Sequence, residues 1–172
     1  AGGQVAAGAE WTREEIDSSN LGEHTRNRWG GFAEYGTTRG AWQINAGLRA
    51  DHHQEAGWEA APTVSIGRRL NDRSRAYATI ARAYRAPSFT EFYYTDPNNV
   101  GNPDLAAERS WQYEIGASTL VAQTQWQGAI FLRQEQDLVD YVRATDTPPW
   151  VAQNLGEMQT LGVRVSGAVS SA

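Results

Sequence analysis

The chain has 172 residues, of which 20 are acidic and 15 are basic, and its net charge of -5 disfavours a nucleic-acid-binding protein, which normally presents a concentrated basic face. The absence of cysteine excludes disulfide bonds, cysteine-ligated zinc and a cysteine nucleophile. Only 40% of the residues are hydrophobic, and no segment approaches the about 18 consecutive apolar residues of a membrane-spanning helix.

Eight segments alternate apolar and polar residues with a period of two, which predicts β-strands. The clearest is 42–51, where Trp42, Ile44 and Leu48 share one face. In chain order the predicted strands lie at about 4–16, 26–36, 42–51, 59–69, 75–85, 111–118, 123–134 and 160–166. No stretch between them has the period of an amphipathic helix, so we predict an all-β, antiparallel meander.

The predicted links between these strands alternate in length. Short links lie at 36–40, 70–74 and 119–123, and longer ones at about 17–25, 52–58, 86–109 and 135–157. Transmembrane β-barrels have this asymmetry, with tight turns on one side of the membrane and long loops on the other. Such strands have a low mean hydropathy although they cross a membrane, since only every second residue contacts lipid.

The two faces of the predicted strands differ in a way that favours a barrel wall. Aromatic residues lie toward strand ends, as they do at membrane interfaces. A soluble β-sandwich core is the alternative explanation for them, but a sandwich would need large apolar residues on the other face too. That face instead carries charged residues, namely Glu10, Glu34, Arg49, Asp51, Glu114, Arg133 and Arg164. Against lipid, each arginine would cost about 2–4 kcal/mol at the midplane.

One ordered set of residues between 82 and 116 resembles the TonB-dependent outer-membrane receptors, which import siderophores and cobalamin. Each match is weak alone, but their order and spacing are specific. The matching residues are Arg85, Ala86, Pro87, Ser88, Phe89, Glu91, Gly101, Asn102, Pro103, Leu105, Glu108 and the run Glu114-Ile115-Gly116. The run 46–51 and the run 153–163 are similar to further strands of the family, although Arg164 stands where the family has glutamate.

The resemblance covers roughly residues 26–168 and implies a place in a larger molecule. The family has a 22-stranded barrel closed by an internal plug, and no plug-like segment is visible here. Because strand-like alternation continues to both ends of the chain, we expect residues 1–172 to be one barrel fragment, from the C-terminal half. The implied partners are outer-membrane lipid of a Gram-negative bacterium, a ferric siderophore or cobalamin as ligand, and TonB through the missing N-terminal plug region.

The long link at 86–109 is the expected ligand-facing segment. Its prolines at 87, 97 and 103 interrupt strand pairing, since proline has no N–H to donate. Aromatic rings bind the faces of siderophores or corrins with little loss of conformational entropy. The site predicted on this basis consists of Phe92, Tyr93, Tyr94 and Asp96. The alternative is that this loop only crosses between two strands at the rim.

Other functions fit the sequence less well. Asp51, His52, His53 and Glu55 form the one histidine-rich run, but adjacent histidines on a strand point to opposite faces and rarely share a metal ion. A rim hydrolase would need His24, His52 or His53 in a recognisable motif, and none is present. We therefore expect no enzyme activity, no metal, no cofactor and no nucleic-acid partner.

A second membrane function stays open at this point. The eight strands could close on themselves as a small outer-membrane barrel with a structural or adhesive role. Such a barrel must fill its bore with side chains. The many Gly, Ala, Ser and Thr residues on the polar face fill a bore poorly, which favours the receptor interpretation.

Overall fold

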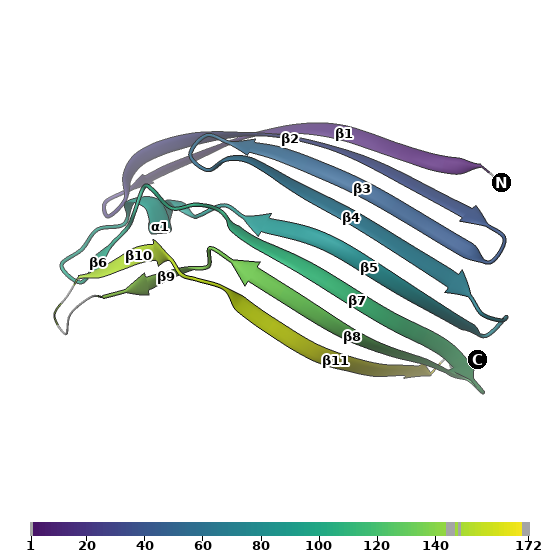
Figure 1. Cartoon of the computed structure of the whole chain (residues 1–172). Helices are drawn as coiled ribbons and strands as arrows, with labels where there is room; N and C mark the ends of the chain where they lie inside the picture. The colour runs from purple at the N-terminus through teal and green to yellow at the C-terminus, as the bar shows by residue number, and fades with distance from the viewer. Residues whose placement is uncertain (1, 144–146, 148, 170–172) are drawn as a thin grey trace.

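The computed structural model describes residues 2–143, 147 and 149–169. Its main feature is one antiparallel sheet of eight strands in chain order, which Figure 1 shows as a single curved wall with β1 and β11 at its edges. The strands are β1 (Gly3–Ser18), β2 (Gly22–Arg39), β3 (Trp42–His53), β4 (Gly57–Arg69), β5 (Ser74–Arg85), β7 (Glu108–Val121), β8 (Thr124–Gln136) and β11 (Met158–Val169). No helix among the described residues is long and apolar enough to cross a membrane.

The strand register confirms the predicted separation of apolar and polar faces. Directly paired residues form one row across seven strands, apolar apart from Thr37, on what we call the outer face: Thr37, Ile44, Ile66, Ala78, Ile115, Ile130 and Val163. A second row lies on the opposite, inner face and is more polar: Glu34, Gly47, Thr63, Ala81, Gln112, Arg133 and Thr160. Val163 is 71% exposed on the outer face, so the apolar residues are not sealed between two stacked sheets.

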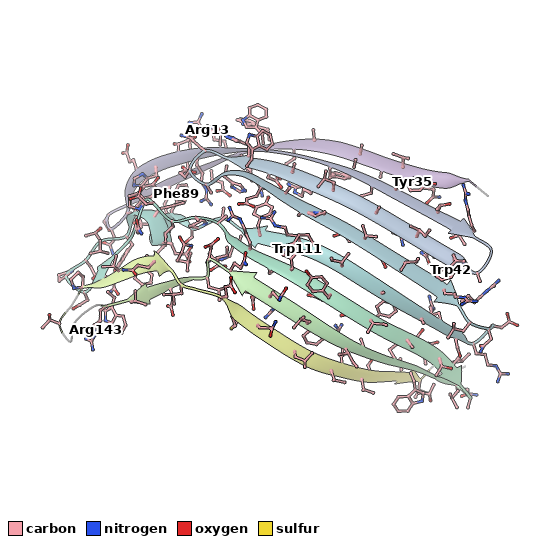
Figure 2. The ribbon with its side chains drawn as sticks, in the orientation of Figure 1. Arg13, Tyr35, Trp42, Phe89, Trp111 and Arg143 are labelled. Carbon is pink, nitrogen blue, oxygen red and sulfur yellow. The ribbon has the colours of Figure 1, made fainter. Side chains whose placement is uncertain are left out.

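Aromatic residues lie at both ends of the outer face, as a row at the loop end and as Trp42 at the turn end. At one end Trp11, Trp29, His52 and Trp58 are directly paired across four strands. At the other end Trp42 lies between its partners on β2 and β4, and Figure 2 shows it beside the short turns. Trp42 and His52 are ten positions apart on β3, which corresponds to about 23 Å along the normal of a membrane crossed at about 45°. This spacing matches the about 25 Å apolar band of outer-membrane barrels.

The predicted long links at 17–25 and 52–58 were wrong. The strands continue through both segments, and only residues 19–21 and 54–56 remain as turns. Around residues 17–25 the strand ends are polar on both faces, so the alternation disappears although the pairing continues. Around residues 52–58 the pairing also continues, with His52 opposite Trp58 on the outer face. The other long links, after β5 and after β8, are confirmed, as are the three short turns at the opposite end.

The two long loops build the rest of the structure at one end of the sheet (Figure 1). The loop after β5 contains a short helix, α1 (Phe89–Tyr93), and β6 (Asn99–Val100), and the loop after β8 contains β9 (Val139–Val142) and β10 (Trp150–Asn154). A second, three-stranded sheet joins the loops in the order β6-β10-β9. The prediction of an all-β, antiparallel chain is confirmed by the eight-stranded sheet, although it did not include this five-residue helix or the small sheet of the loops.

The wall is open, which bears on the alternative of a small closed barrel. In the part of the chain that the structure describes, β1 pairs only with β2, and β11 pairs only with β8. A closed eight-stranded barrel would require β1 and β11 to pair with each other. The strands therefore form an open wall and not the closed barrel of that alternative.

Candidate functional site

The loop after β5 begins with a capped helix. The Ser88 hydroxyl accepts a hydrogen bond from the Glu91 backbone N–H at 3.3 Å, and the Glu91 carboxylate accepts one from the Ser88 backbone N–H at 2.7 Å. This reciprocal arrangement is a capping box, which stabilises the first turn of a helix. It starts α1 immediately after Pro87, whose side chain is fully buried.

Arg85 ties this helix to the start of β7. Its guanidinium donates to Glu108 at 2.7 and 2.6 Å and to Glu91 at 2.9 Å on each of two nitrogens. The planar guanidinium can make both contacts at once because its N–H groups form a rigid fork. Burial alone would raise the pKa of Glu91, but the hydrogen bonds from Arg85 and Ser88 outweigh it and hold that pKa below its usual value.

The next motif residues bring the loop back over the helix. Gly101 donates from its backbone to the Tyr94 carbonyl at 2.6 Å, and Asn102 donates to the Glu91 carbonyl at 2.9 Å. A Cβ atom at residue 101 would lie 2.8 Å from the Phe92 backbone, so only glycine permits this close approach. Leu105 then enters the core beneath the loops, where it is 3% exposed.

Asn154 joins the two long loops. Its side chain accepts from the Ala106 N–H at 2.8 Å and donates to the Ala106 and Asp137 carbonyls at 3.1 and 2.6 Å. The backbones also pair, because β6 and β10 run parallel through the partners Asn99 and Trp150. The loops therefore form one unit over a shared core of Phe92, Leu105 and Ala152.

Helix α1 reaches across the wall to β2. The rings of Tyr93 and His24 stack with centroids 3.7 Å apart and an interplanar angle of 6°. Arg26 lies over the Phe89 ring at 4.4 Å, donates to the Pro87 carbonyl at 2.8 Å and forms an ion pair with Glu14. The loop after β5 thus contacts a strand three positions away in the sheet.

Two carboxylates are buried where β5 parts from β4. The register of these strands ends at Thr63 and Ala81. Beyond that point Arg82 and Arg109 both donate to Glu59, with shortest distances of 2.8 and 2.6 Å, and the Glu59 side chain is 2% exposed. Asp51 is fully buried and accepts two hydrogen bonds from Arg49 at 2.7 Å and one from the Tyr84 hydroxyl. The sequence prediction missed Glu59, Arg82 and Tyr84.

The four predicted ligand-binding residues do not occupy equivalent positions. Phe92 is 3% exposed and lies in the core of the loop unit, beneath its surface. Tyr93, Tyr94 and Asp96 are each part-exposed. The Tyr94 hydroxyl donates to Asp96 at 3.0 Å, and this hydrogen bond raises the pKa of Tyr94. The backbone N–H groups of Asn98 and Asn99 lower the pKa of Asp96. Ligand binding by all four residues stays a prediction.

The histidines lie as the strand geometry requires. His52 faces outward and contacts the Trp58 ring at 5.1 Å, whereas His53 faces inward and contacts Tyr84 at 5.7 Å. His24 belongs to the contact with α1 described above. Among the described residues no group of three or more His, Cys, Asp or Glu residues is placed to hold a metal ion.

Comparison with known families identifies the wall. The family model described as TonB dependent receptor-like, beta-barrel, matches residues 2–170. The vitamin B12 transporter BtuB of Photobacterium profundum is 24% identical over 178 residues, covering 98% of this chain and 28% of that protein. The ferrienterobactin receptor of Escherichia coli is 36% identical over 91 residues, covering 42% of this chain and 12% of that protein.

Solved structures show the same fold. The siderophore receptor PirA from Pseudomonas aeruginosa superposes with a TM-score of 0.85 and 22% identity, over 95% of this chain and 32% of that one. The chain therefore spans less than a third of the length of the relatives it is compared with here. These relatives are named as receptors and transporters, and none of them as an enzyme.

Proposed function

Since the chain belongs to the family of TonB-dependent receptor β-barrels, we propose that it forms part of the barrel wall of a receptor that imports a scarce nutrient across the outer membrane of a Gram-negative bacterium. The match of the barrel family over residues 2–170 carries this proposal. The apolar outer face and the charged inner face support it, because a barrel wall separates lipid from a polar interior. On this proposal residues 1–172 are one segment of a longer barrel.

We propose further that the ligand is cobalamin or a ferric siderophore. Relatives named for each ligand match the sequence, which supports the class and not one member. The loop unit supplies the recognition surface, through the part-exposed Tyr93, Tyr94 and Asp96. Their backbone is held by the capped helix and by Arg85, so the surface is preorganised and binding orders few further groups.

Energy coupling through TonB is proposed to reach this wall by way of an N-terminal plug region. The inner face supports such a neighbour, because it carries polar side chains along its length. At the turn end a cavity of about 560 Å³ is lined mostly by inner-face residues, among them Gln43, Asn45 and Arg75, and also by Trp42 and Arg68. A protein segment inside the barrel would pair with such groups.

The proposal is tested on the full-length receptor with cyanocobalamin and ferric enterobactin as probes. We expect one of the two to quench the intrinsic tryptophan fluorescence saturably, and to be taken up by cells only when TonB is present. Saturable binding without TonB-dependent uptake would contradict the transport role. Failure of both probes to bind would contradict the proposed ligand class.

Tyr94 supplies the sharper test of the surface. With the probe that binds, we expect Tyr94→Ala to weaken binding about tenfold, because the ring and its hydroxyl are both lost. Tyr35→Ala removes an outward-facing tyrosine at the opposite end of the sheet and serves as the control, with unchanged affinity. Equal affinities for wild type and Tyr94→Ala would remove Tyr94 from the site.

A further inference from the structure

Two arginines flank a tryptophan at the turn end of the outer face. Arg39 on β2 and Arg68 on β4 are the direct cross-strand partners of Trp42 on β3, so the three side chains share the outer face. The Arg68 guanidinium lies 5.1 Å from the centre of the Trp42 ring. We call these three residues the turn-end triad. Figure 2 shows Trp42 at the end of the wall where the strands are joined by short turns.

The charges of the triad are not neutralised within the described part of the chain. Neither Arg39 nor Arg68 has a carboxylate within ion-pair distance there. Elsewhere in the described part of the sheet the arginines that pair with a carboxylate are Arg13, Arg26, Arg28, Arg49, Arg82, Arg85, Arg109, Arg133 and Arg164. Asp72 is the one acidic residue in the three turns at this end. Both guanidiniums are therefore available to an external anion.

The aromatic row at the loop end differs from the triad. It contains Trp11, Trp29, His52 and Trp58 in direct register, without an arginine. The spacing between this row and Trp42 matches the thickness of the apolar band, so the triad lies at the level of the lipid headgroups on the turn side. Arginine matches phosphate because its N–H fork can donate two parallel hydrogen bonds to phosphate oxygens.

An apolar groove begins next to the triad on the same face. It has a volume of about 440 Å³ and lies beside Val64, Ile66, Ile80, Ile115, Ile130 and Leu161. Ile66 is two positions from Arg68 on β4 and shares its face, so the groove begins about 7 Å along the strand from the Arg68 backbone. A phosphate held by the triad would place an attached acyl chain against these residues.

We propose that the turn-end triad and this groove bind an anionic phospholipid of the leaflet that faces the short turns. Arg39 and Arg68 hold the phosphate, Trp42 lies at the level of the glycerol, and the groove takes an acyl chain. The inference goes beyond nutrient transport and rests only on the proposed position of the wall in the outer membrane. The experiment measures the amount of lipid bound to the receptor. Binding of cyanocobalamin and ferric enterobactin is measured separately, so the lipid site and the nutrient site are tested independently.

The test uses native mass spectrometry of the full-length receptor with dioleoylphosphatidylglycerol, and dioleoylphosphatidylcholine for comparison. We expect the receptor to retain phosphatidylglycerol preferentially, and Arg39→Gln/Arg68→Gln to reduce that retention about 25-fold, since each arginine near an anionic surface contributes about fivefold. The matched control, Arg69→Gln/Arg75→Gln, removes the same charge from the inner face at the same end. It should retain the lipid as the wild type does.

Four results would overturn the lipid site. These are unchanged retention in the Arg39→Gln/Arg68→Gln variant, an equal loss in the Arg69→Gln/Arg75→Gln control, equal retention of phosphatidylcholine, and displacement of phosphatidylglycerol by millimolar inorganic phosphate. The last of these would indicate a free-anion site instead of a lipid site.

If the outer-face variant does not fold, lipid retention by the wild type is measured after exposure to about 1 M NaCl instead, because salt screens exposed charges. Retention that does not fall at that salt concentration would also overturn the proposal.

Discussion

In a Phe92→Ala variant of the full-length receptor, we expect both long loops to open together. Phe92 is 3% exposed and packs with Leu105 and Ala152, so one side chain supports the loop after β5 and the loop after β8. Truncating a buried phenylalanine to alanine costs about 3–5 kcal/mol. The three-stranded sheet has few other buried contacts to replace it. Hydrogen exchange should therefore accelerate in α1, β9 and β10 at once.

Phe92→Leu is the conservative control for this experiment. It keeps most of the buried volume, so it should cost less than about 1.5 kcal/mol and leave exchange in β9 and β10 close to that of the wild type. Tyr94→Ala should leave loop exchange unchanged while weakening ligand binding. If Phe92→Ala accelerated exchange in α1 alone, the two loops would not form the single unit that the shared core indicates.

A Glu59→Ala variant should lose about 3 kcal/mol of stability, because it leaves the largely buried Arg82 without a carboxylate, while Arg109 keeps its ion pair with Asp137. The Glu59 side chain is 2% exposed and accepts hydrogen bonds from Arg82 and Arg109. These two arginines hold the parted ends of β5 and β7 against β4. The temperature at which the folded band disappears on an unboiled SDS gel measures the loss.

Glu34→Ala provides the matched control for Glu59. Glu34 also lies on the inner face of the wall, but it is exposed and has no ion pair within the described residues. Its replacement should shift the unfolding temperature very little, since exposed charges contribute at most about 1 kcal/mol. Equal shifts for the two variants would show that the buried position of Glu59 does not determine its effect.

The strands of the wall were predictable from the sequence because the alternation of apolar and polar residues can be seen within each strand alone. Each strand meets a different environment on its two faces, and a period of two records this along the chain. The signal ended before the strands did at Asp17 and Glu23, where both faces are polar. The short turn between these two residues was therefore predicted as part of a long loop.

The loop unit was less predictable because its contacts are distant in sequence. The Ser88 and Glu91 spacing is that of a capping box and is a local signal for α1, although the strand-based prediction places no helix there. The small sheet pairs Asn99 with Trp150, which no local pattern reveals. Motif recognition identified Arg85, Glu91 and Glu108, and the structure assigns these three a supporting role in one hydrogen-bonded network.

Spin-label accessibility along β3 tests the central claim most directly. The chain has no cysteine, so single cysteines can be placed at positions 44 to 49 of the full-length receptor, after any others are replaced, and labelled with a nitroxide in lipid bilayers. The account predicts a period of two. Labels at Ile44→Cys, Ala46→Cys and Leu48→Cys should collide mainly with lipid-soluble oxygen, and those at Asn45→Cys, Gly47→Cys and Arg49→Cys should be shielded from it. Equal oxygen accessibility on both faces, or the reverse order, would contradict a wall with lipid on its outer face.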